Sequence, residues 1–278
     1  MEHAINRRAG KKMEKYFNIR YEFDKRNVHE RIAQQLQSRR PGYICVADGV
    51  ILNIVNRNED YRKVVDNSMF ALCDSSYVPL YIRWIYGHRY SQYCGSQIFQ
   101  DLIASGKYRM AFLGASSDVL NGLKQNLTAL NPQVENMLFH ELPFLDVEDF
   151  DYPAIAKMVE DDGAEIIWVA LGAPKQEIFM NRLQPHLKQG VMIAVGAAFK
   201  FFSGTDVKRA PDWMVRNHAE FIYRIFTEPK KQIRRCYWII RTIPGVLWEE
   251  SKRKRRRKQS NENNDISTSD IDYSGNAI

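Results

Sequence analysis

Residues 165–177 read EIIWVALGAPKQE, and this stretch decides the class of fold. Its first seven residues are almost all apolar, which is typical of a strand buried on both faces of a parallel sheet. Gly172 ends that strand, and Pro174 opens a helix that we predict over 174–187. A strand that passes through a glycine into a helix is the repeating unit of an α/β protein.

The same alternation recurs on both sides of this stretch. Strands are predicted at 16–23, 43–46, 69–73, 108–113, 134–139, 165–171 and 191–195, and helices at 28–36, 56–67, 116–130, 152–162 and 174–187. This order predicts a Rossmann-like, mostly parallel sheet with helices on both faces. Ligands of such folds bind beyond the carboxyl ends of the strands. The candidate site is therefore the set of residues that follow Val46, Cys73, Leu113, Leu171 and Val195.

Composition divides the chain into four regions. We expect a disordered N-terminus at 1–14, an α/β core at 15–210, a basic and aromatic appendage at 211–258, and a disordered tail at 259–278. The appendage is predicted to be helical in pieces, broken at Pro229 and Pro244. The sequence has no run of 18 apolar residues and no apolar leader, so neither a membrane-spanning helix nor a signal peptide is expected.

Positive charge is concentrated in the appendage. The whole chain has a formal net charge of +7, whereas residues 207–258 contain sixteen Lys or Arg against five Asp or Glu. The basic block Lys252–Lys258 follows a group of apolar side chains that includes Tyr237, Trp238 and Trp248. Apolar anchors beside a cationic block are typical of a segment that lies on an anionic membrane surface. Nucleic-acid binding is the alternative, which is disfavoured because the aromatic residues precede the charge block and do not alternate with it.

Metal and disulfide chemistry is not indicated. Four cysteines are far apart, each in an apolar stretch: Cys45, Cys73, Cys94 and Cys236. Without a CxxC pair or a Cys/His cluster, they are interpreted as reduced thiols of a cytosolic protein. Of two DxD strings that match a common manganese-binding pattern, we interpret 149–151 as a loop in which Asp151 caps a helix, and 270–272 as part of the tail. No metal and no cofactor is therefore expected.

Three strand ends carry glycine, at Gly114, Gly172 and Gly196. Glycine lets a ligand approach the backbone, and the next helix presents free N–H groups to a phosphate. Three such ends indicate a nucleotide site, although tight packing explains any one of them equally well. The sequence lacks GxGxxG and GxxxxGK[ST], which disfavours a dinucleotide site, a P-loop NTPase and a nucleotide-sugar epimerase.

Polar side chains occupy the first turn of the helix after Gly172. Lys175 opposes the helix dipole there unless an anion is bound. Gln176 and Glu177 are suited to hydrogen-bond a base, a ribose or a sugar, and helix capping by Glu177 is the alternative.

Two further candidates follow other strands. Asp74 comes directly after the apolar residues 70–73, where a partly buried carboxylate is suited to act as a general base. Capping of the next helix is the alternative. Lys208 and Arg209 form a cationic pair that is suited to hold a diphosphate, unless the pair belongs to a solvated loop.

Taken in order, these strings resemble the WecG/TagA/CpsF glycosyltransferases, glycosyltransferase family 26. The strings are Cys73-Asp74, Gly114, GAPKQE at 172–177, VGAAF at 195–199, FSG at 202–204, KRAP at 208–211, and Tyr223-Arg224 with Glu228-Pro229. They span roughly residues 16–240. The resemblance implies a β-inverting, metal-independent transferase of cell-surface polysaccharide assembly. Its donor would be a UDP-sugar of the N-acetylmannosamine type, and its acceptor a sugar on undecaprenyl diphosphate.

The resemblance also implies residue roles. Asp74 and Gln176 correspond to the catalytic aspartate and to the family's glutamine. The donor and its diphosphate would meet Gly114, Gly172, Lys175, Glu177, Gly196, Lys208 and Arg209. The acceptor and the appendage would involve Asp48, Arg224, Lys231 and Arg234. The sequence departs from the family pattern at Val46, Asp48, Ser75, Gln92, Gln97 and Lys200.

The implied setting is cytoplasmic and peripheral, on the inner face of the plasma membrane. The implied partners are the UDP-sugar, the lipid-linked acceptor and an anionic membrane surface, without nucleic acid. A homo-oligomer is left open. The alternative function is a nucleotide-sugar-binding or nucleic-acid-binding protein that uses the basic segment.

Overall fold

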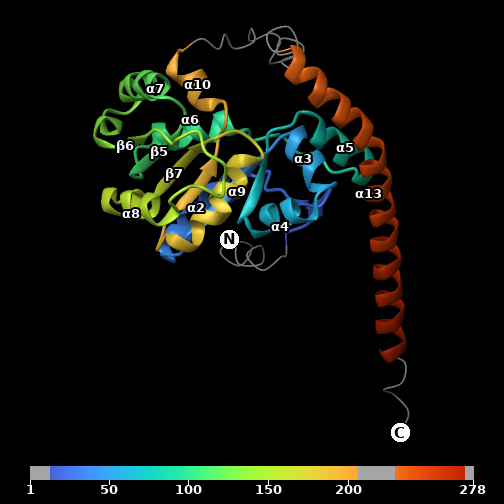
Figure 1. The fold of residues 1–278 in the computed structure, drawn as a ribbon. Coiled ribbons are helices and arrows are strands. Elements are labelled where there is room, and N and C mark those ends of the chain that lie inside the picture. Colours follow the sequence, from blue (N-terminus) through green and yellow to red (C-terminus); the bar gives the residue numbers. More distant parts are fainter. Residues whose placement is uncertain (1–12, 206–228, 273–278) are drawn as a thin grey trace.

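The computed structural model describes residues 13–205 and 229–272. Within them, six parallel strands form one sheet in the order β4-β3-β8-β7-β5-β6, and β1 and β2 form a separate antiparallel pair (Figure 1). The strands are β1 Lys15–Tyr16, β2 Ile19–Arg20, β3 Gly42–Ala47, β4 Phe70–Cys73, β5 Met110–Gly114, β6 Leu138–His140, β7 Ile166–Ala170 and β8 Val191–Ala194. Every neighbouring pair in the large sheet is parallel, which confirms the predicted α/β class.

Helices cover both faces of the sheet. They are α2 Lys25–Gln37, α3 Gly49–Val55, α4 Glu59–Asn67, α5 Tyr77–Tyr86, α6 Gly95–Ser105, α7 Ser117–Leu130, α8 Tyr152–Asp162, α9 Lys175–Leu183, α10 Ala198–Ser203 and α13 Pro229–Asp272, with 3₁₀ turns η1 Pro132–Asn136 and η2 Gln184–His186. Successive strand residues point to opposite faces, so Ile167 and Val169 pack toward α3, α4, α5, α8 and α9, whereas Ile166 and Trp168 pack toward α2, α6, α7 and α10. The two cores hold the strand ends rigidly.

The N-terminal segment is a tight hairpin and not the single strand predicted over 16–23. Phe17 and Asn18 have positive φ angles of 53° and 65°, which reverse the chain between β1 and β2. Tyr16, Phe17 and Ile19 are all buried against the core. Alternating apolar residues therefore indicated burial correctly but gave no sign of the turn.

Helices α3, α5, α6 and α10 were not predicted. Helix α3 has only seven residues, too few to show a helical period. Helix α5 is rich in β-branched and aromatic residues, which have low helix propensity, and contains Pro79. Proline is tolerated there because it is the third residue of the helix, in the first turn, whose N–H groups have no partner within the helix.

The C-terminal helix α13 runs past one face of the domain (Figure 1). Pro229 opens it, but Pro244 lies inside it, so the predicted break at Pro244 is wrong. Packing compensates for the hydrogen bond that proline removes, because Ile243, Val246 and Leu247 pack against the core. The helix also continues to Asp272, into the stretch for which composition predicted disorder. None of the helices in the described residues is both long and apolar enough to cross a membrane.

Candidate active site

The carboxyl ends of four neighbouring strands bring the predicted polar groups to one edge of the sheet. Asp74 follows β4 and Asp48 follows β3, and the last residues of these two strands are register partners. The two carboxylate-bearing residues therefore leave the sheet side by side. Gly196 and Gly172 lie just beyond β8 and β7, the next two strands in the sheet order.

Asp74 is exposed, and not partly buried as predicted. Its Oδ1 accepts a hydrogen bond of 3.1 Å from the Gly95 N–H at the start of α6, and its own N–H donates to the Ala47 carbonyl at 3.0 Å. Asp74 does not cap the next helix, because the residue that precedes α5 is Ser76. The carboxylate is thus exposed to solvent and held through Oδ1.

Two of the residues that depart from the family pattern are helix caps. Asp48 caps α3, and its Oδ1 accepts from the N–H groups of Val50 and Ile51 at 2.8 and 3.0 Å. Gln97 caps α6, since its Oε1 accepts from the Cys94 N–H at 3.0 Å. Both caps stabilise helix starts that adjoin Asp74.

Gln176 and Glu177 form a buried network beneath the edge. Gln176 is 4% exposed, and its Oε1 accepts from the Gly172 N–H at 3.0 Å. Its Nε2 donates to Glu177 Oε1 at 2.9 Å, while the Tyr61 hydroxyl donates to Glu177 Oε2 at 3.1 Å. Gln176 therefore fixes the turn at Gly172. Tyr61 in α4 was missed, because nothing in its local sequence signals a partner 116 residues away.

Glu177 is fully buried. Burial raises its pKa to about 7, hydrogen bonds from Gln176 and Tyr61 oppose the rise, and the nearby charge of Asp48 adds to it. This carboxyl group lies inside the protein, beneath the edge, and its contact with a donor stays a prediction.

Lys175 is directed toward the loop that joins β6 to α8. Its Nζ donates to the Leu145 carbonyl oxygen and lies 5.2 and 5.4 Å from the ring centroids of Phe144 and Phe150. A carbonyl and two aromatic faces therefore accommodate the cation, and no anion is needed to explain a lysine in the first turn of α9.

The three predicted glycines differ in their surroundings. A Cβ atom added at Gly114 would lie 2.7 Å from the Ala170 carbonyl oxygen, so strand packing explains this glycine. A Cβ atom at Gly172 would meet no atom within 4 Å, and one at Gly196 would lie 3.6 Å from Gln176 Oε1. Gly172 is exposed, with a φ of 77°, and leaves its backbone open to a ligand.

Several predicted residues lie outside the described part of the chain. These are Lys208, Arg209 and Arg224, together with the side chains of Lys231, Arg234, Cys236 and 270–272. In the described part, Cys45 and Cys73 are buried and Cys94 is half-buried, all as free thiols. Asp151 caps α8, as predicted, by accepting from the Ala154 N–H at 2.9 Å. Among the described side chains, no group of three His, Cys, Asp or Glu residues is placed to hold a metal ion.

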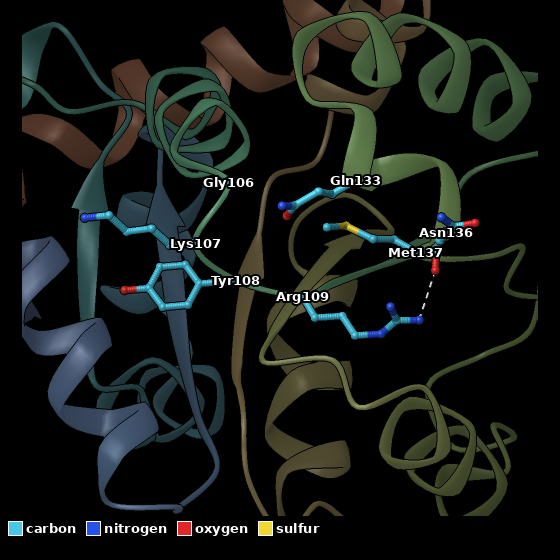
Figure 2. A pocket seen from close by; sticks show the side chains of 7 residues that line it. All are labelled: Gly106, Lys107, Tyr108, Arg109, Gln133, Asn136 and Met137. Carbon is cyan, nitrogen blue, oxygen red and sulfur yellow. Dashed lines mark hydrogen bonds between the residues drawn. The ribbon is translucent and has the colours of Figure 1, made fainter.

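A shallow pocket of about 320 Å³ lies at the opposite edge of the sheet, before β5 and β6 (Figure 2). It is lined by Gly106, Lys107, Tyr108, Arg109, Gln133, Asn136 and Met137. The Arg109 side chain donates to the Asn136 carbonyl at 2.9 Å and forms an ion pair with Asp162 at 2.6 Å. Its cation is therefore already paired, and the pocket is separate from the carboxyl-end site.

Helix α13 reaches the site through α3. Asn53 Nδ2 donates to the Trp238 carbonyl at 2.8 Å, and the Arg57 guanidinium lies 4.0 Å from the Trp238 ring centroid. Ile239 Cδ1 is 3.1 Å from the position of a Cβ atom added at Gly49, the residue after Asp48. The appendage thus packs beside the capping carboxylate.

Comparison with known proteins identifies relatives of the whole core and much of the appendage. The model of the glycosyl transferase WecG/TagA/CpsF family matches residues 15–260. The N-acetylglucosaminyldiphosphoundecaprenol N-acetyl-beta-D-mannosaminyltransferase of Bacillus subtilis (strain 168) is 30% identical over 223 residues, which cover 76% of this chain and 84% of the relative. The enzyme of the same name from Staphylococcus aureus (strain NCTC 8325) is 24% identical over 228 residues, covering 81% and 85%.

Proposed function

We propose a specific reaction for this chain, which belongs to the WecG/TagA/CpsF glycosyl transferase family and is a glycosyltransferase. The reaction is transfer of an N-acetylmannosamine-type sugar from a UDP donor to an N-acetylglucosamine-type sugar on undecaprenyl diphosphate. It inverts the donor's anomeric centre to a β linkage and contributes to a cell-surface polysaccharide. The names of two relatives, which describe this transfer, support the choice of sugars.

Asp74 is the proposed general base. It takes the proton from the acceptor hydroxyl, whose oxygen attacks the anomeric carbon from the face opposite the UDP leaving group. One observation carries this assignment. Asp74 is an exposed carboxylate at the carboxyl edge of the sheet, and the N–H of Gly95 holds its Oδ1.

The leaving diphosphate is proposed to bind at the turn after β7. Gly172 is exposed but its N–H is bonded to Gln176 Oε1, so the backbone that follows it, at Ala173 and at the start of α9, is proposed to offer N–H groups for the diphosphate oxygens. Lys208, Arg209 and Arg224 are the proposed cations that neutralise the charge developing on it, in place of a metal. Because Lys175 is directed to Leu145, we do not assign it a contact with the donor.

We further propose that α13 docks on the anionic inner face of the plasma membrane. Tyr237, Ile240 and Trp248 are exposed apolar residues on α13, and Arg255 and Arg256 are exposed cations farther along it. Within the basic block, Arg253 and Lys254 instead bond to Asn18 and to the Ile85 carbonyl. The attraction to anionic lipids is therefore assigned to the exposed Arg255 and Arg256 and not to the whole basic block.

Transfer assays on the parent and on two aspartate variants test the reaction. A panel of UDP-sugars is offered with an undecaprenyl-diphosphate-linked acceptor, and Asp74→Asn is expected to lower turnover by ~10²–10⁴-fold. The matched variant is Asp48→Asn, which keeps a capping side chain on α3 and removes only the neighbouring charge. Turnover of Asp74→Asn within about threefold of the parent, with a large loss for Asp48→Asn, would move the base to Asp48. No transfer from any UDP-sugar by the parent would overturn the proposed reaction.

A further inference from the structure

Helix α5 carries apolar side chains on both of its faces. Its inner face is buried in the core through Val78, Ile82 and Ile85. Its outer face carries Tyr77, Leu80 and Trp84, which are 43%, 52% and 74% exposed. Positions i, i+3 and i+7 lie on one stripe of a helix, and a helix that is apolar all round is normally covered on both sides.

The outer stripe begins next to the proposed base. Only Ser75 and Ser76 separate Asp74 from the first residue of α5. From Tyr77 to Trp84 the helix rises about 10 Å, at 1.5 Å per residue. A surface that contacts this stripe therefore lies within a few residues of Asp74.

The C-terminal end of α5 meets α13. The Tyr86 hydroxyl donates to Glu250 Oε1 at 2.8 Å, and Lys254 Nζ donates to the Ile85 carbonyl at 2.5 Å. Figure 1 shows the two helices beside each other along the same side of the domain. The end of α5 just after Trp84 thus adjoins the segment of α13 that leads to the exposed cations Arg255 and Arg256.

We propose that the outer face of α5 is a second lipid-contacting surface, which inserts into the interface of an anionic bilayer beside α13. Tyr and Trp are the side chains that favour the bilayer interface, and Leu80 adds aliphatic area between them. Exposed Arg83, together with the α13 cations, complements an anionic lipid surface.

Docking through α5 has a consequence for the reaction. It holds Asp74 at the level of the lipid head groups, where the sugar of a lipid-linked acceptor emerges. This consequence rests on the proposed function, whereas the lipid contact of α5 does not.

The test is vesicle binding by the full-length chain with the double substitution Leu80→Gln and Trp84→Gln. Vesicles of phosphatidylglycerol and phosphatidylcholine are sedimented with parent and variant protein. Loss of two side chains from the apolar interface is expected to weaken binding at least about tenfold. The matched control is Leu130→Gln at the end of α7, because Leu130 is 52% exposed, as Leu80 is, but belongs to a helix on the other side of the molecule from α5 (Figure 1). It is expected to bind vesicles as the parent does.

Two further measurements separate the alternatives. Thermal melting and the solution mass without lipid are expected to be the same for parent and double variant. Parental vesicle binding by the double variant overturns the proposal. A lower melting temperature or an altered mass, with vesicle binding unchanged, would instead assign the stripe to another segment of this chain or to a second copy.

Activity distinguishes this proposal from the proposed reaction. The double variant is expected to keep parental turnover on a water-soluble, short-chain acceptor and to lose it on the same acceptor embedded in vesicles. If the parent transfers no sugar to either acceptor, the proposed reaction fails, while the vesicle sedimentation still decides the role of α5.

Discussion

Replacing Glu177 with glutamine isolates the energetic effect of a buried carboxyl group. Glu177 is fully buried and bonded to Gln176 and Tyr61, and its pKa is raised from 4.5 to about 7. In Glu177→Gln the side chain keeps its shape and an oxygen that accepts from Gln176. Its amide nitrogen is suited to donate to the Tyr61 oxygen. The variant carries no charge there at any pH.

The sign of the effect follows from proton binding. Because the folded protein holds this proton more tightly than the unfolded chain does, the folded state loses stability as the pH rises from about 4.5 to 7. Below pH 4.5 the carboxyl group is mostly protonated in both the folded and the unfolded protein, so it costs no stability. Above pH 7 the folded protein bears the full cost of the buried negative charge. A tenfold change in proton affinity corresponds to about 1.4 kcal/mol, so the rise in pKa corresponds to about 3 kcal/mol at pH 8.

Urea unfolding of parent and Glu177→Gln between pH 4.5 and 8 measures this cost. The free energy of unfolding of the variant minus that of the parent is expected to rise by about 3 kcal/mol as the pH is raised from 4.5 to 8. Other titrating groups are common to both proteins and cancel in the difference. A difference that stays constant with pH would refute the reasoning, because a change in hydrogen bonding alone does not follow the titration of this carboxyl group.

Three other predictions concern the same edge. Gln176→Ala should cost about 1–2 kcal/mol of stability through its lost hydrogen bonds. It should also lower kcat/KM, because the turn at Gly172 is no longer held. A lower melting temperature with unchanged kcat/KM would assign Gln176 a structural role alone. Gly172→Ala should lower stability by only ~1–2 kcal/mol, because alanine disfavours a positive φ. Gly114→Ala should lower it clearly more, because its Cβ atom would also clash with the Ala170 carbonyl oxygen. Equal losses in Tm for the two variants would contradict this account. Sugar transfer should continue in the presence of EDTA. Loss of activity with EDTA that Mn²⁺ restores would contradict the metal-free mechanism.

The sequence predicted the parallel sheet and its functional edge because those features have local signals. The buried strand β7, the glycine after it and helix α9 are adjacent in the chain, and β7 stands out as a continuous apolar run that ends at that glycine. Helices α3 and α5 lacked such a signal, since α3 is short and α5 is apolar on both faces. An all-apolar pattern does not distinguish a helix from a strand.

Site residues were predictable by position but not by orientation. The positions of Asp74 and Gly172 follow from where their strands end. Lys175 and Glu177 share the first turn of α9, yet one is directed to Leu145 and the other is buried against Tyr61. Both contacts join segments far apart in sequence, so they depend on the assembled fold and not on local pattern.

The packing of α13 decides how its role should be tested. Deleting 236–278 removes the segment proposed to face the membrane, but it also uncovers core that Val246 covers and leaves Asn53 and Tyr86 without the partners they have in α13. Loss of activity after such a truncation therefore mixes membrane release with disturbance of α3 and α5, the two helices that adjoin Asp48 and the proposed base. Substitution of the exposed Arg255 and Arg256 by serine leaves those contacts in place. A fall in vesicle binding and in its salt dependence, with turnover on a water-soluble acceptor retained, would then report on the membrane alone.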